Sequence, residues 1–232
     1  MKCVWEHNGG DTLLYSAECI GAYARGENLE TAIAKMKAEI ASYTAWRDGT
    51  EQEVCIEIVQ EKESDLQIAD ADSDVLFDTE TEPLSRQEYE MLKALALKSA
   101  EDFYNLYSAI PNKQESCLPL RRTFYGNVPR TAQEMYDHTK NVNAYYFGGI
   151  GIEADNEGTI YDCRKRGFEL LEQSQGFLNN PVIEGSYGEL WSLRKVLRRF
   201  IWHDRIHAKA MWRMAVKTFG AFDNGNPFKF CW

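Results

Sequence analysis

Three of the four histidines in this 232-residue chain have the spacing and surroundings expected of metal ligands. His203 and His207 are four positions apart, so an α-helix would project both imidazoles from one face. Apolar residues follow helical spacing through the same stretch: Leu193, Leu197, Phe200, Ala210 and Met214. The pattern predicts a helix whose inward stripe contains both histidines.

The third histidine, His138, belongs to a second predicted helix. Thr131 and Glu134 have the spacing of a capping box that opens a helix. The apolar stripe that follows, through Met135 and Val142, also includes His138, so we expect this imidazole to face the same interior. The remaining histidine, His7, belongs to a predicted turn and is left out of the site.

Each histidine alone could be an ordinary core residue whose ring nitrogens find hydrogen-bond partners. Three buried imidazoles together favour a divalent metal, because one ion supplies a strong partner to all three. Three histidines with an open coordination position are typical of catalytic rather than structural zinc. We therefore predict a metal site of His138, His203 and His207, with zinc or nickel as the expected ion, although the ligands also suit cobalt, copper and iron. Asp137 and Asp204 point about 100° away on their helices and are expected near the site or on the surface.

Four predicted amphipathic helices position these ligands. The first starts at the capping box of Ser85 and Glu88 and ends before Pro111. The others run over residues 131–147, 159–177 and from about 189 to 217. Such helices can bury their stripes against each other as an up-down four-helix bundle with the site between them. Tyr145 and Phe200, on the ligand stripes, are expected to be core residues or pocket walls.

The helix order and the three ligands resemble the DinB-like superfamily of metal-binding four-helix bundles. The matching residues are His138 in Tyr-Asp-His-Thr and the His203/His207 pair in Trp-His-Asp-Arg-Ile-His-Ala, over about residues 84–218. The resemblance implies a divalent metal and an activity as a thiol-dependent transferase or isomerase, in which the metal holds a low-molecular-weight thiol as thiolate. A hydrolase is the other chemistry that such a site supports, since three neutral ligands leave the ion its full charge to acidify bound water.

The N-terminal segment predicts a small β-β-α-β unit. Residues 2–6 and 13–19 favour strands around an Asn-Gly-Gly-Asp turn, Asn28 caps a helix, and residues 54–59 are rich in β-branched side chains. The run from Ala17 to Ala32 resembles the strand-to-helix junction of HicB-like antitoxin domains. That resemblance implies a protein-interaction role, whereas a fused unit that covers a pocket or mediates dimerisation is the simpler interpretation.

Charge divides the chain into two predicted domains, residues 1–80 and 81–232. The first 80 residues contain 6 Lys and Arg against 18 Asp and Glu, a net of −12, and the remainder has a net of +2. Such an acidic surface repels phosphate backbones, so no nucleic-acid partner is expected. Most of the acidic segment 60–83 is predicted to be a solvated linker, and its apolar island at residues 75–77 is a candidate for a last strand. The aromatic tail after Phe219 is expected to dock on the protein.

Compartment and partners follow from what the sequence contains. The six cysteines form no C-x-x-C pair and are interpreted as free thiols. The sequence shows neither a signal-peptide pattern nor an 18-residue apolar run, which predicts a cytoplasmic chain without membrane contact. We expect a metal-dependent enzyme of DinB-like type that acts on a small molecule or thiol. Both predicted domain types are compatible with a homodimer. The alternative is a non-catalytic HicB-related interaction module with a structural or vestigial metal.

Overall fold

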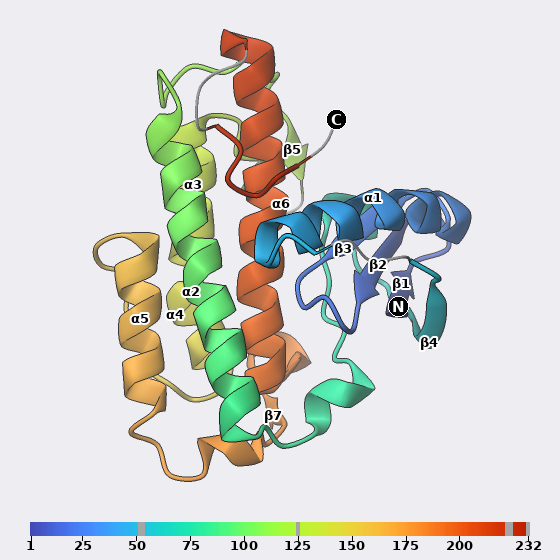
Figure 1. Ribbon diagram of the computed structural model, residues 1–232, viewed down its shortest axis with the longest axis vertical. Coiled ribbons are helices and arrows are strands. Elements are labelled where there is room, and N and C mark those ends of the chain that lie inside the picture. Colours follow the sequence, from blue (N-terminus) through green and yellow to red (C-terminus); the bar gives the residue numbers. More distant parts are fainter. Residues whose placement is uncertain (51–53, 124–125, 221–224, 231–232) are drawn as a thin grey trace.

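The computed structural model describes residues 1–50, 54–123, 126–220 and 225–230. A four-stranded sheet with one helix on it is followed by a bundle of helices (Figure 1). The mixed α and β composition agrees with the predicted fold class. None of the helices among the described residues combines the length and apolarity required to cross a bilayer.

The sheet is built from β1 (Lys2–His7), β2 (Thr12–Ser16), β3 (Tyr23–Gly26) and β4 (Glu57–Glu63), in the order β3-β2-β1-β4. β2 pairs antiparallel with both β1 and β3, and β4 pairs parallel with β1. Helix α1 (Leu29–Arg47) makes the crossover to β4, and the Asn28 side chain accepts a hydrogen bond from the backbone N–H of Thr31 at its start.

The predicted β-β-α-β order omitted β3. This strand has only four residues and follows a turn that includes Gly21, at φ +90°. So short a segment carries too little alternation to be told from the loop before the helix. The last strand also begins later than predicted, at Glu57 rather than residue 54, and extends to Glu63.

The prediction of a solvated linker over residues 60–83 is wrong. β4 occupies its start, and 3-10 helices at Ile68–Asp70 and Asp78–Thr81 follow. Ile68, Val75 and Phe77 are buried in a cluster with Trp202. The acidity is tolerated because basic side chains of the last helix meet it: Arg198 Nη2 donates to Glu80 Oε2 at 3.0 Å.

The bundle consists of α2 (Arg86–Ala109), α3 (Ala132–Asn141), α4 (Asn143–Gly148), α5 (Ile160–Leu171) and α6 (Leu193–Phe219). α3 and α4 are the predicted second helix, divided at Val142. The predicted third helix ends at Leu171, and residues Phe177–Asn179 form a separate 3-10 turn. Two short hairpins complete the chain, β5 (Arg122–Thr123) with β6 (Gly126–Asn127) and β7 (Ile183–Glu184) with β8 (Leu190–Trp191).

The bundle does not alternate in direction as predicted. The backbone N–H of Ile160 donates to the Tyr136 hydroxyl, and Asn143 Nδ2 donates to the Cys163 carbonyl. From the first contact to the second, the residue numbers increase in both elements, so α5 runs parallel to α3 and α4. The order is therefore up, down, down, up. Residues 149–159 return along the bundle to permit this, and Asn143 Nδ2 holds that connection at the Asp155 carbonyl.

Helix α6 lies at the centre of the molecule, between the other bundle helices and the sheet unit (Figure 1). Its buried charges face both partners: Arg205 Nε donates to Glu39 of α1 at 3.0 Å, and Asp204 accepts from Arg164 Nη2 of α5 at 2.9 Å. Buried apolar residues of the sheet unit and the bundle also join in one cluster. The two predicted segments therefore share a core along α6.

The C-terminal tail docks as expected in its described part. Phe228 and Phe230 are buried, and Phe228 packs on Trp46 of α1. Phe222 and Trp232 lie outside the described residues, as does Cys231. The five described cysteines are free thiols.

Candidate metal centre

The three predicted ligands come together at the interface of α3 and α6. Ser192 caps α6 with its hydroxyl on the backbone N–H of Lys195, and Thr131 caps α3 on that of Glu134. α6 then places His203 and His207 one turn apart. α3 passes it in the opposite direction, which brings His138 opposite the pair.

The geometry is compact enough for one ion. One nitrogen from each imidazole lies within 4.8 Å of the other two. Ring centroids are 4.5 Å apart for His203 and His207, 4.6 Å for His138 and His207, and 5.1 Å for His138 and His203. Zinc–nitrogen bonds of about 2.0–2.1 Å in a tetrahedral site put ligand nitrogens roughly 3.4 Å apart. Small side-chain rotations close that difference, so the donor set fits a divalent transition metal.

The site is open on one side. His203 is buried with 7% exposure, His207 is half-buried and His138 is exposed. The expectation that all three imidazoles face the interior is therefore wrong for His138. His138 belongs to the inward stripe of α3, but it lies on the rim of the interface between α3 and α6 and not within it. A ligand that joined the three imidazoles would approach from this rim.

The environment holds the imidazoles in the form that binds metals. Burial lowers the pKa of His203 well below its usual value, and the neighbouring His207 lowers it further. Burial also lowers the pKa of His207 to about 3 and reduces that of His138. All three rings are thus neutral at physiological pH. Each then has a nitrogen lone pair available without the loss of a proton.

A buried atom at the centre lacks a hydrogen-bond partner. Among the described residues, no donor or acceptor reaches Nδ1 of His203, which is shielded from solvent. An unsatisfied buried polar atom costs about 1–3 kcal/mol. A cation or a water molecule drawn into the site would reduce that cost by engaging the His203 ring.

The aspartates next to the ligands make different contacts from one another. Asp204 is fully buried and forms a bidentate pair with Arg164 of α5, with Nη2 to Oδ1 at 2.9 Å. Asp137 is half-buried and accepts a hydrogen bond from Gln133 of the same helix at 2.9 Å. Neither carboxylate belongs to the histidine group. Asp204 therefore belongs to the bundle core rather than to the surface, whereas the half-buried Asp137 lies nearer the solvent.

Aromatic rings and one arginine form the inner wall beside His203. The Tyr146 and Trp202 rings lie 6.0 and 6.2 Å from the His203 ring. Arg199, one turn earlier on α6, lies over the Trp202 ring at 4.9 Å and donates to the Ser73 carbonyl at 2.7 Å. Phe200 is buried core, as expected, whereas Tyr145 is 42% exposed and donates to Glu189.

Sequence reasoning missed the buried positive charges of α5 and α6. Arg164, Lys195, Arg198, Arg199 and Arg205 are all buried, although such side chains are normally found on the surface. One signal was present: basic residues crowd positions 194–199 while acidic residues crowd 60–83. Opposite charge densities of that kind indicate segments that pack together.

His7 is separate from the centre, as expected. Its ring stacks on Trp5 with centroids 4.1 Å apart, and its Nε2 lies 3.1 Å from Glu61. It therefore provides a natural control residue for experiments on the other three.

The long connection over residues 111–130 is described except at 124–125. The backbone N–H of Cys117 donates to Thr218 near the end of α6, and Arg121 pairs with Asp70 at 2.8 Å. The connection therefore runs from the C-terminal part of α6 to the segment after the sheet.

Comparison with known proteins finds no relationship. No family model matches the chain, and neither a curated protein nor a solved structure matches it significantly. The function must therefore be inferred from the site itself.

Proposed function

We propose that this protein is a metal-dependent enzyme of DinB-like type, in which His138, His203 and His207 hold one divalent transition-metal ion. The observation that supports the proposal best is the convergence of three neutral imidazoles within 4.8 Å around a side that is open at His138. Structural metal sites are usually closed by a fourth protein ligand, whereas catalytic sites keep one position for water or substrate. No Cys, Asp or Glu of the described chain joins the histidine group.

The reaction we propose is a thiol-dependent transfer, or a hydrolysis. A divalent ion bound by three neutral ligands would supply a strong positive charge that acidifies a thiol or a water molecule. His138 on the rim leaves a path for a small molecule. The buried Tyr146 and Trp202 rings limit water on the inner side of His203.

Zinc and nickel are the ions we propose first. Both bind imidazole well, and three nitrogen ligands with an open position suit either. A low-molecular-weight thiol is the proposed co-substrate because a thiolate is a soft, strong ligand for both. The alternative is a HicB-related interaction module whose metal is structural or vestigial. An ion with a structural or vestigial role would not bind an added thiol.

Elemental analysis of protein purified without a histidine tag tests the proposal. We expect about one zinc or nickel ion per chain, and its loss from a His203→Ala, His207→Ala double variant. His7→Ala serves as the matched control and should keep the metal. A wild-type protein that cannot be loaded with added zinc or nickel would exclude the enzyme as proposed.

Cobalt substitution then distinguishes enzyme from module. The visible spectrum of the Co²⁺ form should change when a low-molecular-weight thiol is added, because a thiolate enters the open position. A metal-bound protein whose Co²⁺ spectrum ignores thiols and other small ligands would indicate a closed, structural site.

A further inference from the structure

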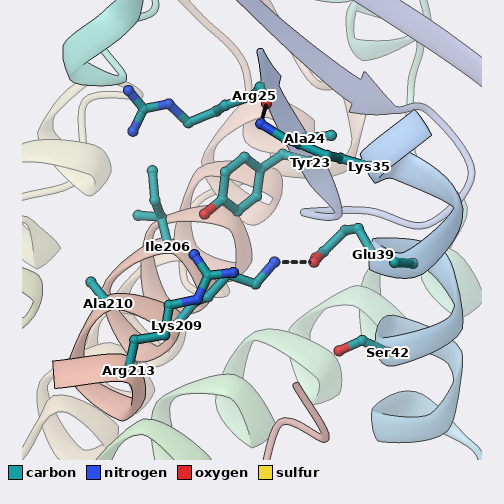
Figure 2. Close-up of a pocket in the computed structure, with 11 residues that line it drawn as sticks. Tyr23, Ala24, Arg25, Lys35, Glu39, Ser42, Ile206, Lys209, Ala210 and Arg213 are labelled. Atoms are coloured by element: carbon teal, nitrogen blue, oxygen red, sulfur yellow. Dashed lines mark hydrogen bonds and ion pairs between the residues drawn. The ribbon is translucent and has the colours of Figure 1, made fainter. Parts of the chain in front are cut away.

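A hollow in the described part of the chain lies away from the histidines, between the sheet unit and α6. It has a volume of about 440 Å³ and is bounded by β3, α1 and the later turns of α6. Figure 2 shows the side chains of these three elements converging around the Tyr23 ring. Its volume is in the range of small-molecule sites.

The charges around this hollow are strongly one-sided. Arg25, Lys35 and Arg213 line it, and no carboxylate among the described residues pairs with any of them. The one acidic residue in the lining, Glu39, is already engaged by Arg205 beneath and by Lys209 at 2.6 Å. The hollow thus has an excess of positive charge, although the first 80 residues have a net charge of −12. Several positive charges on one concave surface raise the local concentration of anions.

The walls between the cations are apolar. Ala24, Ala38, Ile206 and Ala210 line the hollow together with the ring of Tyr23. In Figure 2 this ring lies between Arg25 on one side and Lys209 and Arg213 on the other. A bare inorganic anion would leave the apolar wall unused. A carbon skeleton with anionic groups would contact both kinds of surface.

We infer that this hollow binds a small organic anion that carries two negative charges, on a phosphate monoester or on two carboxylates. Guanidinium groups suit both because their planar donors match two oxygens at once. Ile206 immediately precedes His207, so the ligand would lie on the face of α6 next to that of the proposed metal. Binding at the hollow requires neither the metal nor the proposed enzyme activity.

Calorimetric titration of chelator-treated, metal-free protein at fixed ionic strength tests the inference. The probes are phenyl phosphate, succinate, inorganic phosphate and, as a neutral control, benzyl alcohol. We expect a dissociation constant below about 1 mM for phenyl phosphate or succinate. Whichever binds better identifies the anionic group, and inorganic phosphate should bind more weakly. Failure of both organic anions to bind at about 10 mM, or equal binding of benzyl alcohol, would overturn the proposal.

Charge variants locate the site. Arg213→Gln and Arg25→Gln should each weaken binding about tenfold, because each removes a charge-assisted contact. Lys37→Gln removes the same charge from an exposed position of α1 outside the hollow, and it should leave the affinity unchanged. Equal losses in all three variants would indicate a diffuse surface field and overturn the inference. His138→Ala should bind the anion as wild type does, and a loss there would assign the anion to the histidine site.

Discussion

The Arg164 guanidinium of α5 and the Asp204 carboxylate of α6 form a bidentate ion pair inside the bundle, with exposures of 1% and 0%. The same Arg164 group donates to the carbonyl of Ala96 in α2 at 3.0 Å. Three helices thus meet at one buried charge pair. Asp204 directly follows the proposed ligand His203, so this pair also fixes the part of α6 from which the imidazole projects.

Asp204→Ala should destabilise the metal-free protein by about 3–5 kcal/mol, because it leaves Arg164 buried without its counter-charge. Urea denaturation measures this change. The control is Glu169→Ala on α5, which breaks an exposed pair with Lys165 and should cost less than about 1 kcal/mol. A double variant, Arg164→Met with Asp204→Leu, should recover much of the loss. Similar costs for Asp204→Ala and Glu169→Ala would contradict the role given to the buried pair.

Added zinc or nickel should raise the melting temperature of wild-type protein, because an ion that binds only the folded state stabilises it. At a free concentration 100 times the dissociation constant the gain is about 2.7 kcal/mol. His138→Ala should remove most of the shift while changing the stability of the metal-free protein little, since this side chain is exposed. Differential scanning fluorimetry of the two proteins, with His7→Ala as control, provides the measurement. An unchanged shift in His138→Ala would show that the metal binds elsewhere.

Stability of the metal-free protein should fall as pH decreases below about 6.5. His207 has a folded-state pKa of about 3 against an ordinary value of 6.5, so between these values the unfolded chain binds a proton that the folded chain does not. His207→Gln should therefore reduce the slope of unfolding free energy against pH by up to about 1.4 kcal/mol per unit in this window. Urea denaturation at pH 5 and pH 7 measures the difference. Parallel pH profiles for the wild type and the variant would contradict the lowered pKa.

Gly167 of α5 should not tolerate a larger residue. A Cβ atom there would lie 2.1 Å from the Phe147 ring, which α4 packs directly against this position. Gly167→Ala should destabilise the protein by about 1–3 kcal/mol, although alanine favours the helix. Gly148→Ala is the matched control, since a Cβ atom there meets no neighbour within 4 Å. Thermal unfolding that ranks the two variants in the opposite order would refute the close packing of α4 on α5.

The sequence by itself identified the proposed ligands and the main helices, although not the division of the second at Val142 or the end of the third at Leu171. Capping boxes at Ser85 and Thr131 and the stripe through His203 and His207 are local patterns, and the structure contains both caps and the one-turn spacing. Local hydrogen bonds and helical periodicity act between residues a few positions apart. For that reason they can be recognised without the fold.

Only the tertiary structure decided how these elements meet. The parallel direction of α5, the docking of residues 64–83 on α6 and the exposure of His138 all depend on contacts between residues far apart in the chain. The buried pairs of Arg164 with Asp204 and of Arg205 with Glu39 belong to the same class. A charged residue has the same sequence signature whether water or a counter-charge surrounds it. Its environment depends on whether another element of the fold supplies a counter-charge.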